Sequence, residues 1–397
     1  MKYLFYLLPG LLNVVIGMFF FITAKRLADA GASSLAVTAT MPMWAFIYAV
    51  CSYAVGKIAT RDNAVKILLI SQFILLGAMV GMLVSPGLKL QYFWLLLSGI
   101  GTGLFFSPFQ GVVKLFEKVE LSPETFARSS AIYTFSWSIG QGLGPLTAGI
   151  VWGAFDPNSG WQYCYAINIC IVAAVIISLL LMHRFIKRRI SDEAQQSAAV
   201  PTADTPQLTW QVPDIMPAIW VLALGGFLTL SVLRSYLPDF ATKTMQLPTT
   251  AQGIMLSLIS VVQAVVALSC LRSRAWQFKP WVGGAAVLLA CSALIMLTVN
   301  STLFCAWGAA ALFGCFSGVL CYNMAYHALA NAHCSARYAA INETIVGGMS
   351  VFAPLGAGFL ADKTSPEMPF YLLTAALLLA GAGFCKLTWK HRNYLKN

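Results

Sequence analysis

Charged side chains are scarce in this 397-residue chain: Asp, Glu, Lys and Arg make up 10% of it, against roughly 25% in soluble domains. Hydrophobic residues make up 59%, and the mean hydropathy is +0.75. This shortage of charge excludes a water-soluble globular protein. Long polar tracts are also missing, apart from one segment near the middle of the chain, so the sequence offers no separate soluble domain.

The sequence also lacks the patterns that mark common enzyme classes. It contains no H-E-x-x-H or G-x-S-x-G motif, and no pair of carboxylates falls inside an apolar segment. Its ten cysteines include no C-x-x-C pair. We interpret them as small apolar packing residues rather than as disulfides or zinc ligands. We therefore expect no enzymatic activity, no cofactor and no metal site.

Long apolar runs dominate what is present. A helix needs about 20 mostly apolar residues to cross a bilayer, and twelve segments meet that length. They lie near residues 4–24, 35–56, 65–84, 90–113, 128–153, 162–182, 216–237, 251–271, 280–299, 302–326, 339–361 and 368–389. A β-barrel would instead show alternating segments of about 10 residues. The runs predict an all-α membrane protein with 12 transmembrane helices.

An internal repeat divides these twelve segments into two sets of six. Residues 127–149 align without a gap to residues 336–358, and eight of the 23 positions are identical. The identical positions include the pairs Arg128 and Arg337, Pro145 and Pro354, and Gly149 and Gly358. Such repeats are typical of transporters built from two related bundles.

The repeat predicts two pseudo-symmetric six-helix bundles joined by a linker. We place the first bundle at residues 1–190 and the second at residues 214–397. Residues 191–213 are rich in Ser, Gln, Thr and Pro and low in hydrophobicity. That composition favours a flexible tether, which would let the bundles rock against each other.

Basic residues predict the orientation of the chain. With the N-terminus placed inside the cell, 19 of the 25 Lys and Arg residues fall on the cytoplasmic side, as the positive-inside rule expects. Both termini are therefore predicted to be cytoplasmic, in a cell membrane or inner membrane. The net charge of +11 is explained by loops that face anionic lipid, so we expect no nucleic-acid partner. We expect the chain to act as a monomer.

The loop between the second and third segments carries a partial family signature. The chain resembles the major facilitator superfamily in its twelve helices, its two similar halves and its long central loop. In that family the loop between helices 2 and 3 carries the signature G-x-L-A-D-R-x-G-R-K. Gly56, Arg61 and Lys66 match it, while Thr60 replaces the acid and Asn63 replaces the second glycine. The resemblance implies alternating access, with this loop latching the two bundles on the cytoplasmic side. An ordinary basic loop is the alternative interpretation.

A second signature begins at Gly140 and reads G-Q-G-L-G-P-L-T-A-G. It resembles the antiporter motif of the same family, and it includes Gly144, Pro145 and Gly149. In that family the motif is associated with export by antiport. Glycines four residues apart allow close helix contact, and proline bends the helix, so plain packing is the alternative. One departure is Leu95, which stands where drug/proton exporters of this family have an arginine.

Charges inside apolar spans are costly and are therefore candidates for function. Glu343 is the one acid well inside a predicted span. It could bind a proton on one side of the membrane and release it on the other, with His327 as a relay partner. Alternatively, Glu343 forms a structural network with Arg337 or Asn342.

Arg234 is the second charge inside a span. Its guanidinium could bind a carboxylate or phosphate of a substrate, which would favour an anionic solute. Alternatively, it snorkels outward or pairs with Asp239, five residues later.

The family resemblance also implies that helices 1, 4, 7 and 10 line a central cavity. Polar and aromatic residues on these helices are substrate-binding candidates. They are Asn13, Phe109, Gln110, Arg234, Tyr236, Tyr322, Asn323 and Tyr326. Neighbouring helices add Tyr133, Trp137, Gln263 and Asn342. Many rings with few charges suit either a sugar or a hydrophobic compound.

Together these features predict a secondary transporter that moves a small-molecule substrate across the lipid bilayer. We favour proton-coupled export by antiport. The alternative is uptake of a sugar or organic anion by symport or uniport. A transporter-like membrane sensor or a membrane enzyme is a remote alternative.

Overall fold

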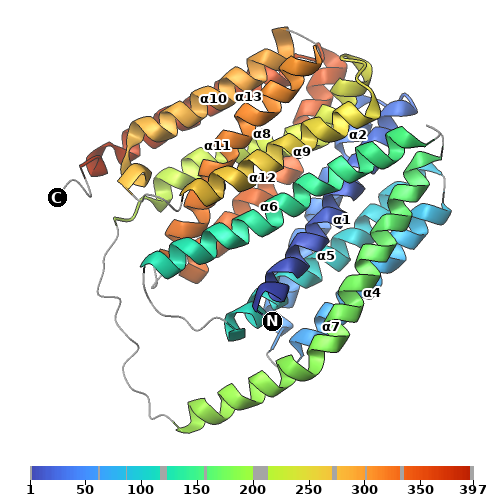
Figure 1. Cartoon of the computed structure of the whole chain (residues 1–397). Helices are drawn as coiled ribbons and strands as arrows, with labels where there is room; N and C mark the ends of the chain where they lie inside the picture. The colour runs from blue at the N-terminus through green and yellow to red at the C-terminus, as the bar shows by residue number, and fades with distance from the viewer. Residues whose placement is uncertain are drawn as a thin grey trace.

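The computed structural model describes residues 2–60, 63–85, 87–116, 123–155, 159–199, 213–270, 275–299, 302–330 and 335–393. The described residues form helices and no strand (Figure 1). The first half contains α1 (Lys2–Asp29), α2 (Ser34–Thr38), α3 (Thr40–Ile58), α4 (Ala64–Val84), α5 (Leu88–Phe116), α6 (Pro123–Ala154) and α7 (Gly160–Ala199). The second half contains α8 (Met216–Lys243), α9 (Thr249–Ser269), η2 (Ala275–Phe278), α10 (Pro280–Val299), α11 (Leu303–Ala330), α12 (Ser335–Lys363), α13 (Met368–Thr388) and η3 (Trp389–His391).

All twelve expected spans coincide with helices, and ten candidate membrane spans are long and apolar enough within the described residues. Helices form because lipid offers no hydrogen-bond partner, so each backbone group must be satisfied within its own segment. The expected span at residues 35–56 differs in one respect, because α2 and α3 are separated at Ala39. Pro42 explains this break, since it lacks the N–H that would bond to the Thr38 carbonyl.

Helix α7 extends further than the sequence analysis expected. It continues to Ala199, so residues 191–199, the first part of the expected linker, are helical. This segment contains no Gly or Pro and is rich in Ala and Gln, which favour helix. Pro201 follows, and proline disfavours helical geometry in the residue before it. The rest of the expected linker, residues 200–212, lies outside the described residues.

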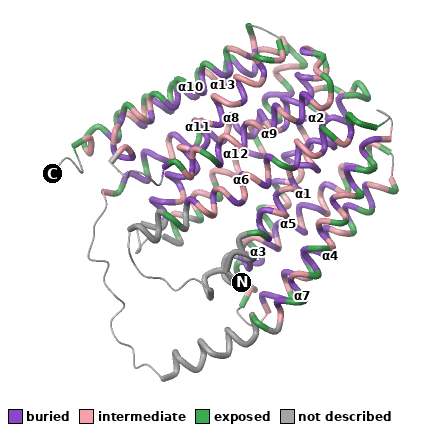
Figure 2. The backbone as a smooth tube through the Cα atoms, in the orientation of Figure 1, coloured by how far each residue is buried: buried purple, intermediate pink, exposed green. Residues whose placement is uncertain are grey.

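The two halves meet along two seams. Helix α6 packs along α9, and α2 and α3 pack against α12. Between these seams α1 packs against α8, and these two helices are the most buried of the candidate spans. Figure 2 shows buried residues along the inner faces of the central helices. The interior between α1 and α8 is therefore the place to look for a site.

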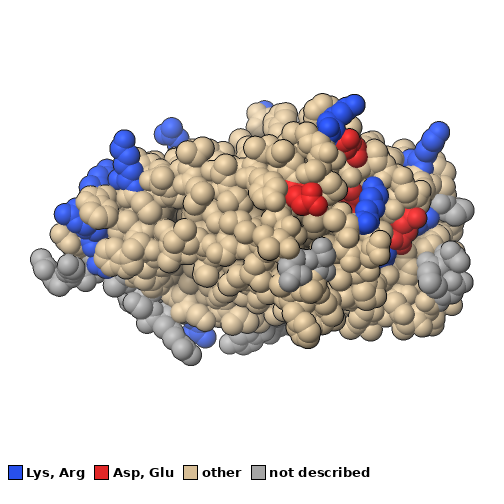
Figure 3. Space-filling model, turned by 90° about the horizontal axis from the view of Figure 1, so that it is seen from above, with Lys and Arg blue, Asp and Glu red and all other residues tan. Residues whose placement is uncertain are grey.

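We call the end at which α1 and α8 begin the terminal end, because both chain termini lie there (Figure 1). The opposite end, where α1, α8 and α12 finish, is the distal end. Figure 3 shows Lys, Arg, Asp and Glu mainly toward the two ends of the face in view, with a broad band of uncharged surface between them. Such a band matches the hydrocarbon core of a bilayer.

Candidate functional site

Glycines of α6 bring this helix close to both halves of the molecule. Gly140 and Gly144 face α1, and a Cβ atom on Gly144 would lie 2.5 Å from the Val14 carbonyl oxygen. Gly149 faces α9, where a Cβ atom would lie 2.8 Å from the Gly253 Cα atom. No real Cβ could occupy these positions without a shift of the backbone. The motif that begins at Gly140 thus makes the close helix contacts that its small residues predict.

The two prolines of the repeat occupy equivalent places in α6 and α12. Pro145 lies against α1, where a Cβ atom on Gly17 would approach its Cδ atom to 3.1 Å. Pro354 lies one turn before Gly358, the glycine of α12 that meets α2. Pro145 therefore lies at the contact of α6 with α1, and Pro354 lies one turn from the contact of α12 with α2.

Contacts at the distal end join α2 to the second half. The Asp362 carboxylate accepts hydrogen bonds from the backbone N–H groups of Ser34 and Leu35, both at 2.9 Å. The Ser34 hydroxyl donates to Asp239 at 2.6 Å. A Cβ atom on Gly358 would lie 2.7 Å from the Leu35 Cα atom. We call this set the distal contacts, and they close the distal end between α2 and α12.

Toward the terminal end, α12 packs less tightly against α3 than it packs against α2 at Gly358. Gly347 still approaches α3, because its Cβ would lie 3.9 Å from that of Ala49. Glu343, one turn nearer the terminal end on the same face, is exposed and has no hydrogen bond or ion pair with another described residue. It lies within electrostatic range of Tyr48 on α3, as does Tyr133 of α6. Glu343 and Tyr133 therefore both lie near Tyr48, and we call this loosely packed boundary of α3, α6 and α12 the gap between the halves.

A small cavity lies at the level of Arg234, between α1, α6, α8 and α9. Its volume is about 30 Å³. It is lined by Ile16, Gly17, Phe20, Phe21, Gln141, Pro145, Arg234, Leu256, Ile259 and Ser260. The Nη2 atom of Arg234 and the Oε1 atom of Gln141 are buried and have no hydrogen-bond partner. Arg234 does not pair with Asp239, which binds Lys243 at 2.6 Å instead.

Gln263 links three helices across the seam between the halves. Its Nε2 atom donates to the Ser138 hydroxyl of α6 at 2.6 Å. Its Oε1 atom accepts from the Ser317 hydroxyl of α11, also at 2.6 Å. All three side chains are buried. Gln263 is therefore hydrogen-bonded across the seam through both its amide nitrogen and its amide oxygen.

The structure does not bring His327 to Glu343. The buried His327 ring packs edge-on against Phe278 and Tyr326, with centroids at 5.5 and 5.0 Å. Asn342 also points away from the gap, because its Oδ1 atom accepts a 2.9 Å hydrogen bond from the Trp220 indole. Glu343 therefore contacts neither His327, its expected relay partner, nor Asn342, one of its two expected structural partners.

Other candidates of the second half lie in its packed interior. Tyr236 is buried near the distal end and donates to the Pro366 carbonyl at 2.8 Å. Tyr322 stacks on Tyr326, with ring centroids 5.9 Å apart. Asn323 is buried, and its Oδ1 atom has no hydrogen-bond partner. None of these four candidates lines the cavity at Arg234.

The described substrate-binding candidates on α1, α5 and α6, namely Asn13, Phe109 and Trp137, also lie away from the cavity at Arg234. The Asn13 side chain donates to a carbonyl of its own helix at 2.8 Å. Phe109 is buried and stacks on Phe105 at 5.0 Å. Trp137 is partly buried and packs against the hydrophobic core. The side chain of Gln110 lies outside the described residues.

No hydrogen bond or ion pair joins the described residues of the basic loop between α3 and α4 to the second half. A Cβ atom on Gly56 would meet nothing within 4 Å. Lys66 is exposed, and so are Arg128 and Arg337, the paired arginines of the repeat. Arg61 lies outside the described residues. The latch that the family resemblance implies is therefore not seen between these described side chains.

A row of aromatic side chains was missed by the sequence analysis. Phe20 of α1 meets Trp44 of α3 edge-on at 5.1 Å, and Trp44 stacks on Tyr48 at 4.8 Å. Phe106 of α5 follows at 6.3 Å from Tyr48. We call these four residues the aromatic row. The four-residue spacing places Trp44 and Tyr48 on one face of α3, and this spacing is the signal in the sequence that points to the row.

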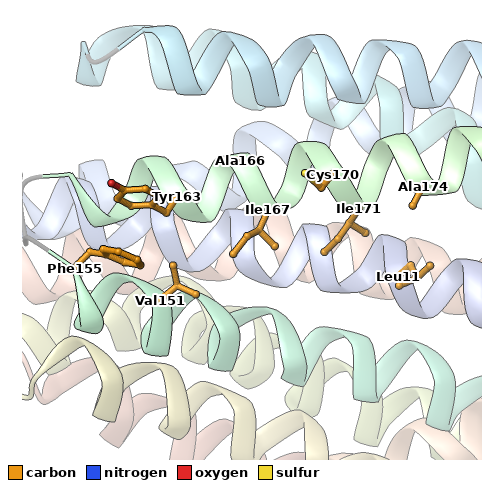
Figure 4. Close-up of a pocket in the computed structure, with 9 residues that line it drawn as sticks. All are labelled: Leu11, Val151, Phe155, Tyr163, Ala166, Ile167, Cys170, Ile171 and Ala174. Carbon is orange, nitrogen blue, oxygen red and sulfur yellow. The ribbon is translucent and has the colours of Figure 1, made fainter.

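An apolar groove lies outside this interior, between α1, α6 and α7 (Figure 4). Its volume is about 550 Å³. It is lined by Leu11, Val151, Phe155, Tyr163, Ala166, Ile167, Cys170, Ile171 and Ala174. Phe155 and Tyr163 stack at 4.2 Å and are half exposed. This groove has no charged lining residue, so it lacks the chemistry to orient a polar solute.

No group of three or more His, Cys, Asp or Glu residues suited to a metal occurs among the described residues. Comparison with known proteins identifies the fold. A family model described as Major Facilitator Superfamily matches residues 4–354. No curated protein matches the sequence.

Solved structures resemble the chain over nearly its whole length. A bacterial homologue of the human lysosomal transporter Spinster, in an inward-facing and unoccupied conformation, has a TM-score of 0.70 at 14% identity, covering 98% of this chain and 96% of its own. The nucleoside transporter NupG has a TM-score of 0.69 at 10% identity, covering 97% and 98%. The human organic anion transporter MFSD10 has a TM-score of 0.61 at 14% identity, covering 96% and 97%.

Proposed function

We propose that this chain, which belongs to the major facilitator superfamily of membrane transporters, is a proton-coupled secondary transporter that exports a small organic solute. The observation that carries the proposal is Glu343, an exposed carboxylate inside a membrane span that faces a gap between the halves and lacks a counter-ion among the described residues. Intramembrane acids of this kind are costly unless they are used.

The gap supplies a physical reason for coupling. In alternating access the distal contacts break and the gap between α3 and α12 closes. Closure would move Glu343 out of water and against Tyr48 and Ala49, which lie on the facing helix. Burying a carboxylate costs far more than burying a neutral carboxylic acid. Proton binding at Glu343 would therefore favour closure, which couples a proton to the conformational step.

The groups that face Glu343 are consistent with this role. Tyr48 of α3 lies within electrostatic range of Glu343, and Tyr133 of α6 lies within electrostatic range of Tyr48. Arg337 of its own helix is exposed and makes no ion pair with it. A permanent ion pair would hold the carboxylate in its charged form, whereas this environment leaves it free to gain and lose a proton.

The direction of transport is inferred from α6. The resemblance of its glycine motif to the antiporter motif supports export, and the packing of that motif on both α1 and α9 supports a role at the moving boundary. We also propose that the terminal end faces the cytoplasm, since the basic residues predict that orientation. The likeness to an inward-facing Spinster homologue agrees with a gap that opens toward that end.

Proton movement in proteoliposomes tests the proposal. The vesicles hold a pH-sensitive dye and are challenged with pooled sugars, organic anions and lipophilic cations, using the wild type, Glu343→Gln and Glu367→Gln. The last variant is a control, because Glu367 lies at the distal start of α13, away from the gap. We expect compound-triggered proton flux that is lost only in Glu343→Gln.

Two outcomes would change the proposal. Protons and compound moving in the same direction would replace antiport by symport, and would favour uptake of a sugar or organic anion. Compound flux without proton movement, or undiminished proton flux in Glu343→Gln, would reduce Glu343 to a structural residue and refute coupling through it.

A further inference from the structure

Arg234 differs from the other cations near the distal end of the interior. Lys25 pairs with Asp29 and Lys243 with Asp239, each at 2.6 Å. Arg26 stacks on the Trp161 ring at 3.6 Å. No acidic partner or hydrogen bond joins Arg234 to another described residue, and its Nη2 atom is buried. An intramembrane guanidinium without an anion is costly, and such a charge is usually kept for a ligand.

The cavity beside Arg234 holds a second unsatisfied group. Gln141 of α6 lines the same space, and its Oε1 atom is also buried without a partner. A flipped amide would present its NH₂ group at this place with the same shape. The guanidinium and the amide could then donate together to one anionic group, and guanidinium donors match carboxylate oxygens well. The two residues come from different halves, so a shared ligand would bridge the seam.

The size of the cavity limits what can enter it here. About 30 Å³ holds one or two waters or a small head group, not a whole organic solute. Phe20 lines the cavity and also begins the aromatic row, which continues through Trp44 to Tyr48. An apolar or aromatic body attached to the head group would therefore have a continuous row of rings to lie against.

We propose that Arg234 and Gln141 form the subsite for the anionic head of the transported solute, and that the solute is a small organic carboxylate whose apolar body lies along the aromatic row. This proposal rests on the proposed transport function, but not on its direction or on the role of Glu343. Ser231 and Ser350 mark the same depth, with their hydroxyls 3.2 Å apart. Arg234 lies three residues beyond Ser231 toward the distal end, and Glu343 lies seven residues before Ser350 toward the terminal end. At ~1.5 Å of helical rise per residue the two side chains are about 15 Å apart along the helices, so anion binding at Arg234 and proton binding at Glu343 can be tested separately.

Binding to the purified full chain in nanodiscs at neutral pH tests the subsite. The probes are phenylpropionate, its uncharged amide phenylpropanamide, and sodium chloride alone. Tryptophan fluorescence reports occupancy of the aromatic row, and the melting temperature reports stabilisation. We expect phenylpropionate to bind at least ~10-fold more tightly than the amide, a ratio typical of one charge-assisted contact.

Variants locate the charge preference. Arg234→Gln should remove it, Arg234→Lys should keep part of it as a point charge, and Gln141→Leu should weaken it. Arg337→Gln loses an equal charge at the exposed terminal end and should bind like the wild type. If Arg234→Gln does not fold, Arg234→Lys and the wild-type ligand series still decide the question.

Several results would overturn the subsite: equal binding of acid and amide, no binding of either, retention of the preference in Arg234→Gln, or stabilisation by chloride without preference for the carboxylate. Failure of this proposal and failure of proton coupling are distinguishable. Glu343→Gln should still bind phenylpropionate preferentially, since binding here needs no proton gradient. If Glu343→Gln loses proton flux but keeps the preference for phenylpropionate over the amide, both roles are supported. If Arg234→Gln keeps both the proton flux and that preference, the subsite alone is refuted.

Discussion

The contact between Asp362 and the start of α2 gives a measurable prediction about the distal end. Its carboxylate accepts two backbone N–H groups, those of Ser34 and Leu35, at 2.9 Å each. Hydrogen bonds to charged groups contribute more than neutral ones, but these are solvent-exposed, so about 1 kcal/mol each is a reasonable value. Asp362→Ala should therefore weaken the closed distal end by about 2 kcal/mol, a shift of roughly 30-fold in its opening equilibrium.

Thiol labelling in nanodiscs measures this opening. Thr38 is fully buried beneath Gly358, so a Thr38→Cys side chain reacts with a membrane-impermeant maleimide only when α2 and α12 separate. Cys170, the exposed thiol among the described cysteines, is first replaced by serine. We expect labelling of Thr38→Cys to accelerate up to ~30-fold in the Asp362→Ala background.

Glu367→Gln serves as the matched control, because it removes a nearby distal acid that makes no described contact with the first half. Its labelling rate should equal that of the parent. Asp362→Asn should fall between, because an amide oxygen still accepts one N–H group. An unchanged rate in Asp362→Ala would refute the reasoning that these two hydrogen bonds hold the distal end closed.

Three further predictions concern packing, the polar seam and orientation. Gly144→Val should lower the free energy of unfolding by about 2 kcal/mol, because its side chain meets the α1 backbone, whereas Gly348→Ala, with open space beside it, should leave the melting temperature unchanged. Gln263→Leu should destabilise the protein by about 2 kcal/mol, because the buried hydroxyls of Ser138 and Ser317 lose their amide partner. Adding Ser138→Ala should recover part of that loss, and equal stability of the single and double variants would contradict this account. A C-terminal epitope tag should be protected from protease in intact cells and cleaved in inside-out vesicles, and the reverse result would invert our proposed orientation.

The sequence was sufficient for the fold because its strongest signals are local. Apolar runs of about 20 residues fixed the helices, and the repeat identified α6 and α12 as equivalent. Glycine spacing also anticipated close packing, which Gly144 and Gly149 confirm on opposite neighbours of α6. The break at Ala39 follows from Pro42, and the end of α7 at Ala199 follows from Pro201. Hydropathy alone indicates neither feature.

The site was less predictable because transmembrane helices are apolar on every side, so periodicity does not tell which face a residue occupies. Asn342 and Glu343 are neighbours in sequence, yet one bonds to Trp220 within the second half and the other faces α3. Arg234 and Asp239 are close along α8, but Lys243, one turn after Asp239, takes the carboxylate. Such choices depend on three-dimensional packing between helices far apart in the chain.

The unequal seams have a consequence for the path of the solute. The contact of α6 with α9 is backbone-close, as Gly149 and Gly253 show, while a Cβ atom on Gly347 of α12 would approach α3 only to 3.9 Å from the Ala49 Cβ atom. A rotation of one half about the α6–α9 line therefore leaves that side nearly still and moves α3 and α12 through the widest arc. If the halves rock as proposed, we expect the opening to be a wedge rather than a symmetric funnel, and we expect a long solute to enter it sideways, from the rim bounded by α3 and α12.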